Sequence, residues 1–170
     1  MPVAVTFRPA TAEDEPFLRR VYVSTRLEEL SVTPWSEEQK LAFLADQFRL
    51  QSAYYAQNYP AGEATTYRVI LCDGIAAGRL IVNSEPKLMR IVDIALLPEY
   101  RGQGIGGSIL GDLLAEADAR GAMVSIHVEK NNPAMRLYAR LGFVPVKDVG
   151  VYLLLERKLN RDAAATSSTQ

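Results

Sequence analysis

Four glycines lie within six residues in the stretch Arg101-Gly-Gln-Gly104-Ile-Gly106-Gly107. The stretch follows an apolar run and precedes a run of apolar residues at helical spacing. The first N–H groups of a helix have no partner inside the helix, and the helix dipole adds partial positive charge there. Because glycine lets a ligand approach the backbone closely, this segment predicts a site for a phosphate group.

The same glycines fit several kinds of turn. A tight turn can use glycine for its backbone dihedral angles alone, without any ligand. Gly102, Gly104 and Gly107 have the spacing of a dinucleotide-binding turn, and Glu129 stands about where its ribose-binding acid is expected. The upstream elements are antiparallel, however, and too little chain follows Glu129 to complete a doubly wound sheet. A Walker phosphate loop is excluded because no Gly-Lys-Ser/Thr sequence follows the glycines.

Helices and strands must position this turn, and the spacing of apolar residues predicts where each of them lies along the chain. Capping boxes predict helices that begin at Thr11 and Ser36, and further helices are expected from Ile105 and over residues 133–141. The pair Asp73-Gly74 predicts a tight hairpin within an antiparallel meander. The expected strands cover residues 3–8, 67–72, 75–82, 88–97, 123–128, 143–149 and 151–155. Residues 1–160 are predicted to form a single domain, and residues 161–170 a disordered tail.

Composition narrows the classes of partner. Nineteen basic and twenty acidic residues give a net charge of −1, which argues against nucleic acid as the main partner. The single cysteine, Cys72, cannot form an internal disulfide, and a small buried side chain is its expected role. No run approaches the roughly 18 apolar residues of a membrane helix, and the N-terminus lacks the features of a secretory signal. These features predict a cytoplasmic protein with no membrane partner.

Written as Arg101-x-x-Gly104-x-Gly106, the glycine turn resembles the acyl-CoA pyrophosphate loop of the GNAT superfamily of N-acyltransferases. A second segment, Asn131-Asn-Pro-Ala134-Met-Arg-Leu-Tyr138-Ala-Arg-Leu-Gly142-Phe143, resembles the second signature of that family. The order of elements matches over roughly residues 3–157. The resemblance implies an α/β fold of the α+β type. In that fold, four or so helices flank a mixed, mostly antiparallel sheet of about seven strands, splayed where acyl-CoA binds.

The resemblance also implies a cofactor site for acetyl-CoA as cosubstrate, with no metal. Backbone groups of the strand before the loop, with Leu96 at the key position, would bind the pantetheine arm. The pyrophosphate would lie on the loop amides, with an added hydroxyl from Ser108. Asn131 matches the asparagine near the cofactor arm, and the adjacent Asn132 is an alternative. The expected cofactor-binding residues are Leu96, Arg101, Gly102, Gln103, Gly104, Ile105, Gly106, Gly107, Ser108 and Asn131.

Tyr138 matches the tyrosine with which relatives protonate the departing thiolate. A phenol with a pKa near 10 can donate that proton, although packing of a short helix against the sheet is a competing role. The base is less well defined, because Arg90 occupies the position at which some relatives carry a glutamate. His127, the single histidine, resembles the strand histidine that acts as base in some protein N-terminal acetyltransferases. Its ordinary pKa near 6.5 suits this function, and a purely structural role is the alternative.

Asp93, Glu129 and a base acting through water remain alternatives to the histidine. The resemblance places the acceptor beside the first two helices and their loops. The candidate residues there are Arg26, Glu28, Glu29, Trp35, Tyr54, Tyr55 and Tyr59, and the tyrosines fit a helix core as well as a pocket.

The predicted activity is N-acetyl transfer from acetyl-CoA to a primary amine by direct attack in a ternary complex. The acceptor, a small-molecule or peptide amine, is not identified by the sequence. A non-catalytic acyl-CoA sensor or structural module is the main alternative, and a dinucleotide-dependent oxidoreductase is a further one. The fold is compatible with a homodimer.

Overall fold

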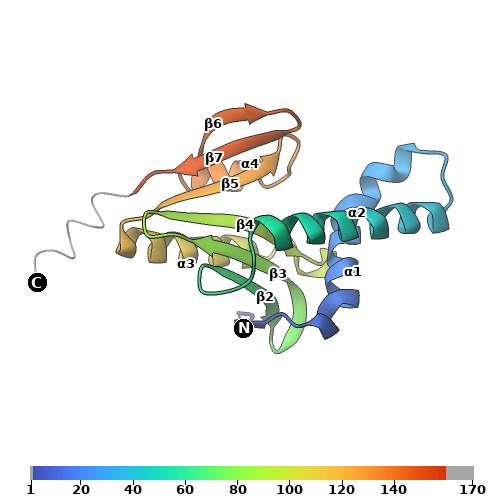
Figure 1. Ribbon diagram of the computed structural model, residues 1–170, viewed down its shortest axis with the longest axis horizontal. Helices are drawn as coiled ribbons and strands as arrows, with labels where there is room; N and C mark the ends of the chain where they lie inside the picture. Colours follow the sequence, from blue (N-terminus) through green and yellow to red (C-terminus); the bar gives the residue numbers. More distant parts are fainter. Residues whose placement is uncertain (1, 160–170) are drawn as a thin grey trace, which may run out of the picture. The chain divides into compact units, whose positions relative to one another are not determined.

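The computed structural model describes residues 2–159, and it places seven strands in one sheet in the order β1-β2-β3-β4-β5-β7-β6. The strands are β1 (Val5–Pro9), β2 (Thr65–Cys72), β3 (Ile75–Ser84), β4 (Leu88–Leu96), β5 (Met123–Glu129), β6 (Val144–Val149) and β7 (Tyr152–Arg157) (Figure 1). The α-helices of the described residues are α1 (Glu15–Arg26), α2 (Glu37–Asn58), α3 (Ile105–Arg120) and α4 (Met135–Arg140). Short 3-10 turns are η1 (Ala12–Asp14), η2 (Leu27–Val32) and η3 (Pro98–Tyr100).

The predicted α+β architecture with a mixed, mostly antiparallel sheet is confirmed. The predicted tail, residues 161–170, lies outside the described residues.

Tertiary contacts divide the chain into two compact units. The first contains the chain up to Ile81 together with Asp93–Gln103. The second contains Val82–Val92 and the described residues from Gly104 onward. Both β3 and β4 therefore run from one unit into the other, and the single domain predicted over residues 1–160 stays a prediction.

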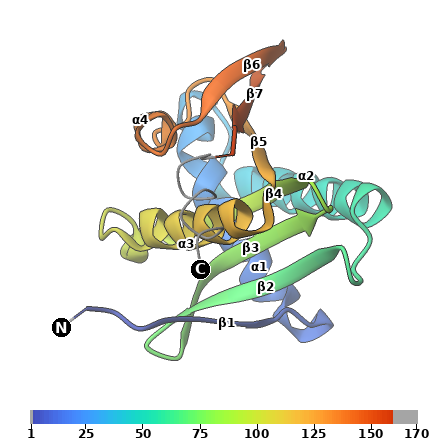
Figure 2. The same cartoon turned by 90° about the vertical axis from the view of Figure 1, so that its left-hand side faces the viewer.

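In the first unit, β1 pairs antiparallel with β2 from Val5 opposite Cys72 to Pro9 opposite Arg68. Figure 2 shows β1, β2 and β3 side by side. Asp73 and Gly74, which join β2 to β3, have φ angles of 49° and 80°. Two left-handed residues in succession give a turn whose twist matches that of the strands, as the sequence predicts.

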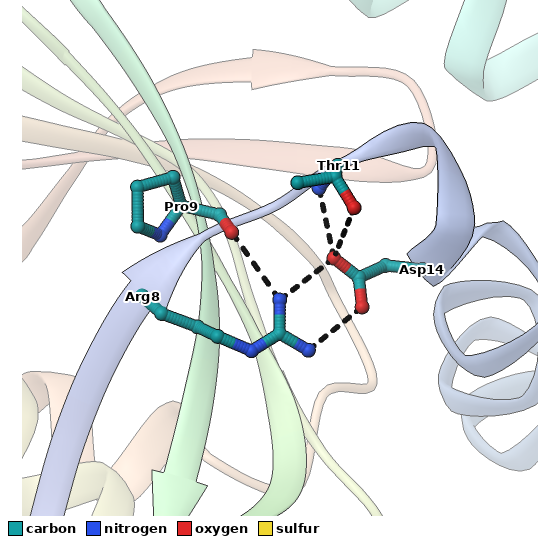
Figure 3. A network of polar contacts seen from close by, with 4 residues as sticks. All are labelled: Arg8, Pro9, Thr11 and Asp14. Atoms are coloured by element: carbon teal, nitrogen blue, oxygen red, sulfur yellow. Dashed lines mark hydrogen bonds and ion pairs between the residues drawn. The ribbon is translucent and has the colours of Figure 1, made fainter.

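The first unit also contains both predicted capping boxes. The hydroxyl of Ser36 accepts the N–H of Gln39 at 3.1 Å, and Gln39 Oε1 accepts the N–H of Ser36 at 2.9 Å, which confirms this start of α2. The Thr11 box opens the 3-10 turn η1, with α1 following directly. The carboxylate of Asp14 in that box accepts the N–H of Thr11 at 2.8 Å. Its two oxygens also accept hydrogen bonds from the two terminal nitrogens of Arg8, at 2.8 and 2.7 Å (Figure 3). These donors hold the pKa of Asp14 well below its ordinary value.

In the second unit, β5 lies parallel to β4 and antiparallel to β7. The parallel ladder runs from Leu88–Met123 to Ile91–Ile126, and β4 continues beyond it to Leu96. The buried side of α3 contains Ile109, Leu110, Leu113, Leu114 and Ala117. The last strand pair folds so that β7, not β6, lies beside β5, with a register shift between Pro145 and Lys147 in β6.

Candidate functional site

The glycine turn forms the start of α3. Gly104 is the N-terminal cap of the helix with φ 81°, a left-handed conformation that disfavours residues with a side chain. The amide of Ser108 donates to the carbonyl oxygen of Gly104 at 3.0 Å. The amides of Ile105, Gly106 and Gly107 precede that bond and have no partner within the helix, which leaves them available to an anion.

Two side chains of the turn, those of Arg101 and Gln103, form hydrogen bonds within the first unit. Arg101 Nε donates to the carbonyl oxygen of Leu96 at 2.9 Å, and its Nη2 donates to Ser24 Oγ at 3.1 Å. Gln103 Nε2 donates to the carbonyl oxygen of Glu99 at 2.7 Å. The amide of Arg101 donates to Pro98 at 3.1 Å, so the amides left for a phosphate begin at Gly102.

The end of β4 lies unusually close to β3. The N–H of Leu97 donates to the carbonyl oxygen of Ala77 at 2.8 Å. A Cβ added to Gly78 would lie 2.2 Å from the carbonyl oxygen of Ala95 and 3.1 Å from the Cα of Leu96. Gly78 therefore permits the path of the strand at Leu96, the predicted position for the pantetheine arm. Gly78 is not among the predicted site residues, although a lone glycine inside a strand run often marks close backbone approach.

Tyr138 lies on α4 in the second unit and is only 5% exposed. Its ring contacts Phe143 edge to face, with the ring centroids 5.8 Å apart. Its carbonyl oxygen accepts the N–H of Phe143 at 3.0 Å and that of Leu141 at 3.1 Å. The tyrosine of the second motif thus has a packing role, and its role as a proton donor stays a prediction.

The two adjacent asparagines have different roles. Asn132 Oδ1 accepts the N–H of Ala134 at 2.8 Å, and the carbonyl oxygen of Asn132 accepts the N–H of Met135 at 3.1 Å. This turn makes α4 begin at Met135 instead of Pro133, a small correction to the predicted start. Asn131 is exposed, and its side-chain amide forms no hydrogen bond with the described residues.

His127 lies on β5 opposite Leu154 of β7, and alternation along the strand places it on the face that carries Ser125. Arg90, the residue at the position of the family glutamate, donates from Nε to Ser125 Oγ at 3.2 Å. The pKa of His127 lies below its ordinary value of 6.5, because partial desolvation of the ring and the charge of Arg90 both disfavour the imidazolium. His127 is therefore neutral at pH 7 and able to accept a proton.

The other base candidates have partners of their own. Asp93 forms an ion pair with Arg79 in the first unit. Glu129 lies at the end of β5 opposite Tyr152, and its carbonyl oxygen accepts the N–H of Asn132 at 3.0 Å. Burial and the nearby Asp73 raise the pKa of the Cys72 thiol, which disfavours a nucleophilic role.

The aromatic residues expected near the acceptor cluster on and beside α2. The rings of Tyr54, Tyr55 and Tyr59 follow one another, with centroids 6.1 and 6.4 Å apart. Tyr67 donates its hydroxyl to the carbonyl oxygens of Tyr59 at 2.6 Å and Tyr55 at 3.2 Å, which closes the end of the helix. Trp35, 39% exposed, packs on Phe43.

The candidate residues divide between the two units. Leu96, Arg101, Gly102 and Gln103 belong to the first, as does Asp93. The second contains Gly104, Ile105, Gly106, Gly107, Ser108, His127, Asn131 and Tyr138.

Within the described chain, no cluster of three or more His, Cys, Asp or Glu side chains could hold a metal ion. No helix of residues 2–159 is long and apolar enough to cross a membrane.

Comparison with known proteins gives a family match and several structural relatives. The model of the acetyltransferase (GNAT) family matches residues 25–143. A protein of Bacillus subtilis (strain 168), named as a candidate ribosomal protein bS18-alanine N-acetyltransferase, is 37% identical over 82 residues. That alignment covers 46% of this chain and 54% of the relative, so the chain matches only about half of the relative's length.

Solved structures of other proteins have a similar fold. The PaiA N-acetyltransferase of Thermoplasma acidophilum, in complex with coenzyme A, superposes with a TM-score of 0.65 at 17% identity, covering 91% of this chain and 99% of that one. The ribosomal-protein-S18-alanine N-acetyltransferase of Escherichia coli superposes with a TM-score of 0.58 at 22% identity, covering 91% and 93%. At these identities the similarity shows a shared fold.

Proposed function

Because the chain belongs to the GNAT family of acetyltransferases, we propose that it transfers an acetyl group from acetyl-CoA to a primary amine. The observation that carries the proposal is the turn before α3, where Gly104 caps the helix and the following amides have no helical partner. A pyrophosphate would accept hydrogen bonds from these amides at the positive end of the helix dipole. The coenzyme A in the complex of the Thermoplasma relative supports the same ligand class here.

Thermal unfolding tests the cofactor assignment directly. Acetyl-CoA, CoA and NADH are added separately to the full chain, each up to millimolar concentration. A ligand that binds only the folded state stabilises it by about 2.7 kcal/mol at 100 times its Kd. We expect a raised midpoint with acetyl-CoA and with CoA, and none with NADH. A shift with NADH alone would contradict the proposal and favour the dinucleotide alternative.

A charge placed in the turn tests the same assignment by mutation. A Cβ added to Gly106 would have no atom within 4 Å, so Gly106→Asp introduces a negative charge with room for the added Cβ. We expect it to weaken acetyl-CoA binding about tenfold or more, because the carboxylate competes with the pyrophosphate for the helix terminus. Gly111→Asp places the same charge in open space further along α3 and should leave the Kd unchanged. Isothermal titration calorimetry measures both, and equal Kd values for the two variants would contradict the turn's role.

In the proposed reaction the amine attacks the thioester carbonyl carbon, a C–N bond forms and the C–S bond breaks. Tyr138 donates its phenolic proton to the departing thiolate, and His127 accepts the proton that the amine loses. The backbone of β4 at Leu96 would orient the pantetheine arm, and the exposed Asn131 would bind it as well. Orientation and fixed dipoles would supply most of the acceleration.

The pH dependence of the rate tests His127. The lowered pKa of the histidine predicts that kcat/KM falls on the acid side only below about pH 6.5, where the imidazole becomes protonated. His127→Ala should remove this limb and reduce kcat about 100-fold. Arg90→Gln removes a nearby positive charge, so it should raise the histidine pKa and move the limb to higher pH. An unchanged profile in His127→Ala would leave the base to water or to another group.

Candidate acceptors are compared by thiol release from acetyl-CoA. A peptide that begins with alanine comes first, because two relatives are named for alanine of a ribosomal protein. The non-catalytic alternative predicts a thermal shift with acetyl-CoA and no acetyl transfer to any amine.

A further inference from the structure

Arg101, the first residue of the glycine turn, is held by two oxygen atoms of the first unit. Its Nε donates to the carbonyl oxygen of Leu96 at 2.9 Å, which links the end of β4 to the start of the turn. Its Nη2 donates to Ser24 Oγ at 3.1 Å, in the last helical turn of α1 and 77 residues away in the sequence. One guanidinium therefore joins α1, the end of β4 and the glycine turn.

The groups that hold Arg101 are both uncharged. Arg8, Arg79 and Arg157 each pair with a carboxylate. Arg101 forms no ion pair with any described carboxylate, and its Nη1 donates to no described residue. A guanidinium keeps its positive charge in proteins, so this charge is held in place without a counter-ion from the described chain. It precedes the Gly104 cap by three residues, where the helix-start amides also suit an anion.

The hydroxyl of Ser24 has a defined orientation. It donates to the carbonyl oxygen of Val21 at 2.6 Å, and its remaining lone pairs can accept the hydrogen bond from Arg101. The next residue, Thr25, donates in the same way to the carbonyl oxygen of Tyr22 at 2.7 Å but forms no hydrogen bond with the arginine. Such bonds back to the helix do not stabilise it, so the helix itself requires neither hydroxyl.

The geometry points to Ser24 as the positioning residue that holds the Arg101 guanidinium in place for the pyrophosphate of the cofactor. The inference rests on the proposed function and goes beyond it, because it gives α1, a helix expected beside the acceptor, a part in cofactor binding. A long exposed side chain loses rotamer freedom when it binds a ligand, which weakens the affinity. Ser24 reduces that loss because the arginine is ordered before the cofactor binds.

Isothermal titration calorimetry of the full chain with acetyl-CoA tests this role. Ser24→Ala removes only the hydroxyl, and we expect the Kd to rise about threefold to tenfold, the effect of ordering one long side chain on binding. The unfolding temperature without ligand should stay within about 2 °C of the wild-type value or rise, because alanine favours a helix more than serine does. A purely structural role of the hydroxyl would lower the stability and leave the Kd unchanged.

Thr25→Val is the matched control, since it removes the neighbouring hydroxyl of the same helix and keeps the side-chain volume. It should leave the Kd for acetyl-CoA unchanged. Ser24→Thr keeps an oxygen that can bond both the helix and the arginine, so its Kd should lie within about twofold of the wild-type value. If Thr25→Val weakens binding as much as Ser24→Ala does, the effect belongs to the helix as a whole and the inference fails.

A double-mutant cycle shows whether Ser24 acts through Arg101. Arg101→Met removes the charge and should raise the Kd about tenfold or more. Adding Ser24→Ala to Arg101→Met should change the Kd by less than about twofold, because the residue that the hydroxyl positions is already gone. A double variant in which the two effects multiply would overturn the inference.

The wild-type titration separates failure of this inference from failure of the proposed function. If the wild type does not bind acetyl-CoA, the proposed function fails first and the inference falls with it. If the wild type binds acetyl-CoA and Ser24→Ala binds it equally well, the inference alone is overturned and the cofactor assignment stands.

Discussion

Tyr138→Phe is expected to lower kcat by about 100-fold or more while the Kd for acetyl-CoA stays close to the wild-type value. General acid catalysis contributes roughly 10²–10⁴ in rate, and phenylalanine cannot donate a proton to the departing thiolate. The substitution keeps the ring, and therefore the edge-to-face contact with Phe143 in the buried interior of the second unit. The loss should be larger for a thioester than for an acyl donor with a less basic leaving group, because a less basic group needs the proton less.

Packing and catalysis by Tyr138 can be separated with two further measurements. The midpoint of thermal unfolding should fall by only a few degrees, since one hydroxyl contributes about 1 kcal/mol in a domain of this size. Tyr152→Phe, which removes the hydroxyl of an exposed tyrosine on β7, should leave kcat unchanged. Full turnover by Tyr138→Phe would remove the tyrosine from the acid role and leave its packing as its function.

The parts of this fold that depend on local sequence were predictable. The Ser36 box and the Asp73-Gly74 turn need only residues a few positions apart, and both form as expected. The predicted start of α4 is two residues early, because Pro133 suits a helix start but the side chain of Asn132 forms a turn with Ala134 first. Local hydrogen bonds of this kind compete with helix propensity and are hard to rank from sequence.

Features that depend on contacts between distant residues could not be predicted. The order β5-β7-β6 and the pairing of Arg157 with Asp118 follow from tertiary packing. The glycine turn could be predicted because the glycines that its backbone conformation needs lie within seven consecutive residues. The ion pair of Arg79 with Asp93 could not, since Asp93 shows in the sequence only as a polar interruption of an apolar strand, with nothing to identify Arg79 as its partner. The sequence therefore defined the glycine turn better than the surroundings of Asp93.

Gly78→Ala should disrupt acetyl-CoA binding although residue 78 lies outside both sequence motifs. The added Cβ would stand 2.2 Å from the carbonyl oxygen of Ala95 and 3.1 Å from the Cα of Leu96, both backbone atoms that cannot rotate away. The end of β4 must shift, at a cost of about 1–3 kcal/mol for an overpacked site. Since Leu96 is the proposed contact for the pantetheine arm, we expect the Kd for acetyl-CoA to rise about tenfold or more, in line with that energy.

Gly111→Ala provides the control for this prediction. It adds the same methyl group in open space within α3, where alanine is favoured over glycine by up to about 1 kcal/mol. Thermal unfolding of both variants, with and without acetyl-CoA, separates stability from binding. Gly78→Ala should unfold at a lower temperature and show a reduced shift with the cofactor, whereas Gly111→Ala should keep the full shift. If Gly78→Ala is destabilised yet binds acetyl-CoA as tightly as the wild type, the glycine serves only the packing of β3 against β4, and the cofactor arm must contact the protein elsewhere.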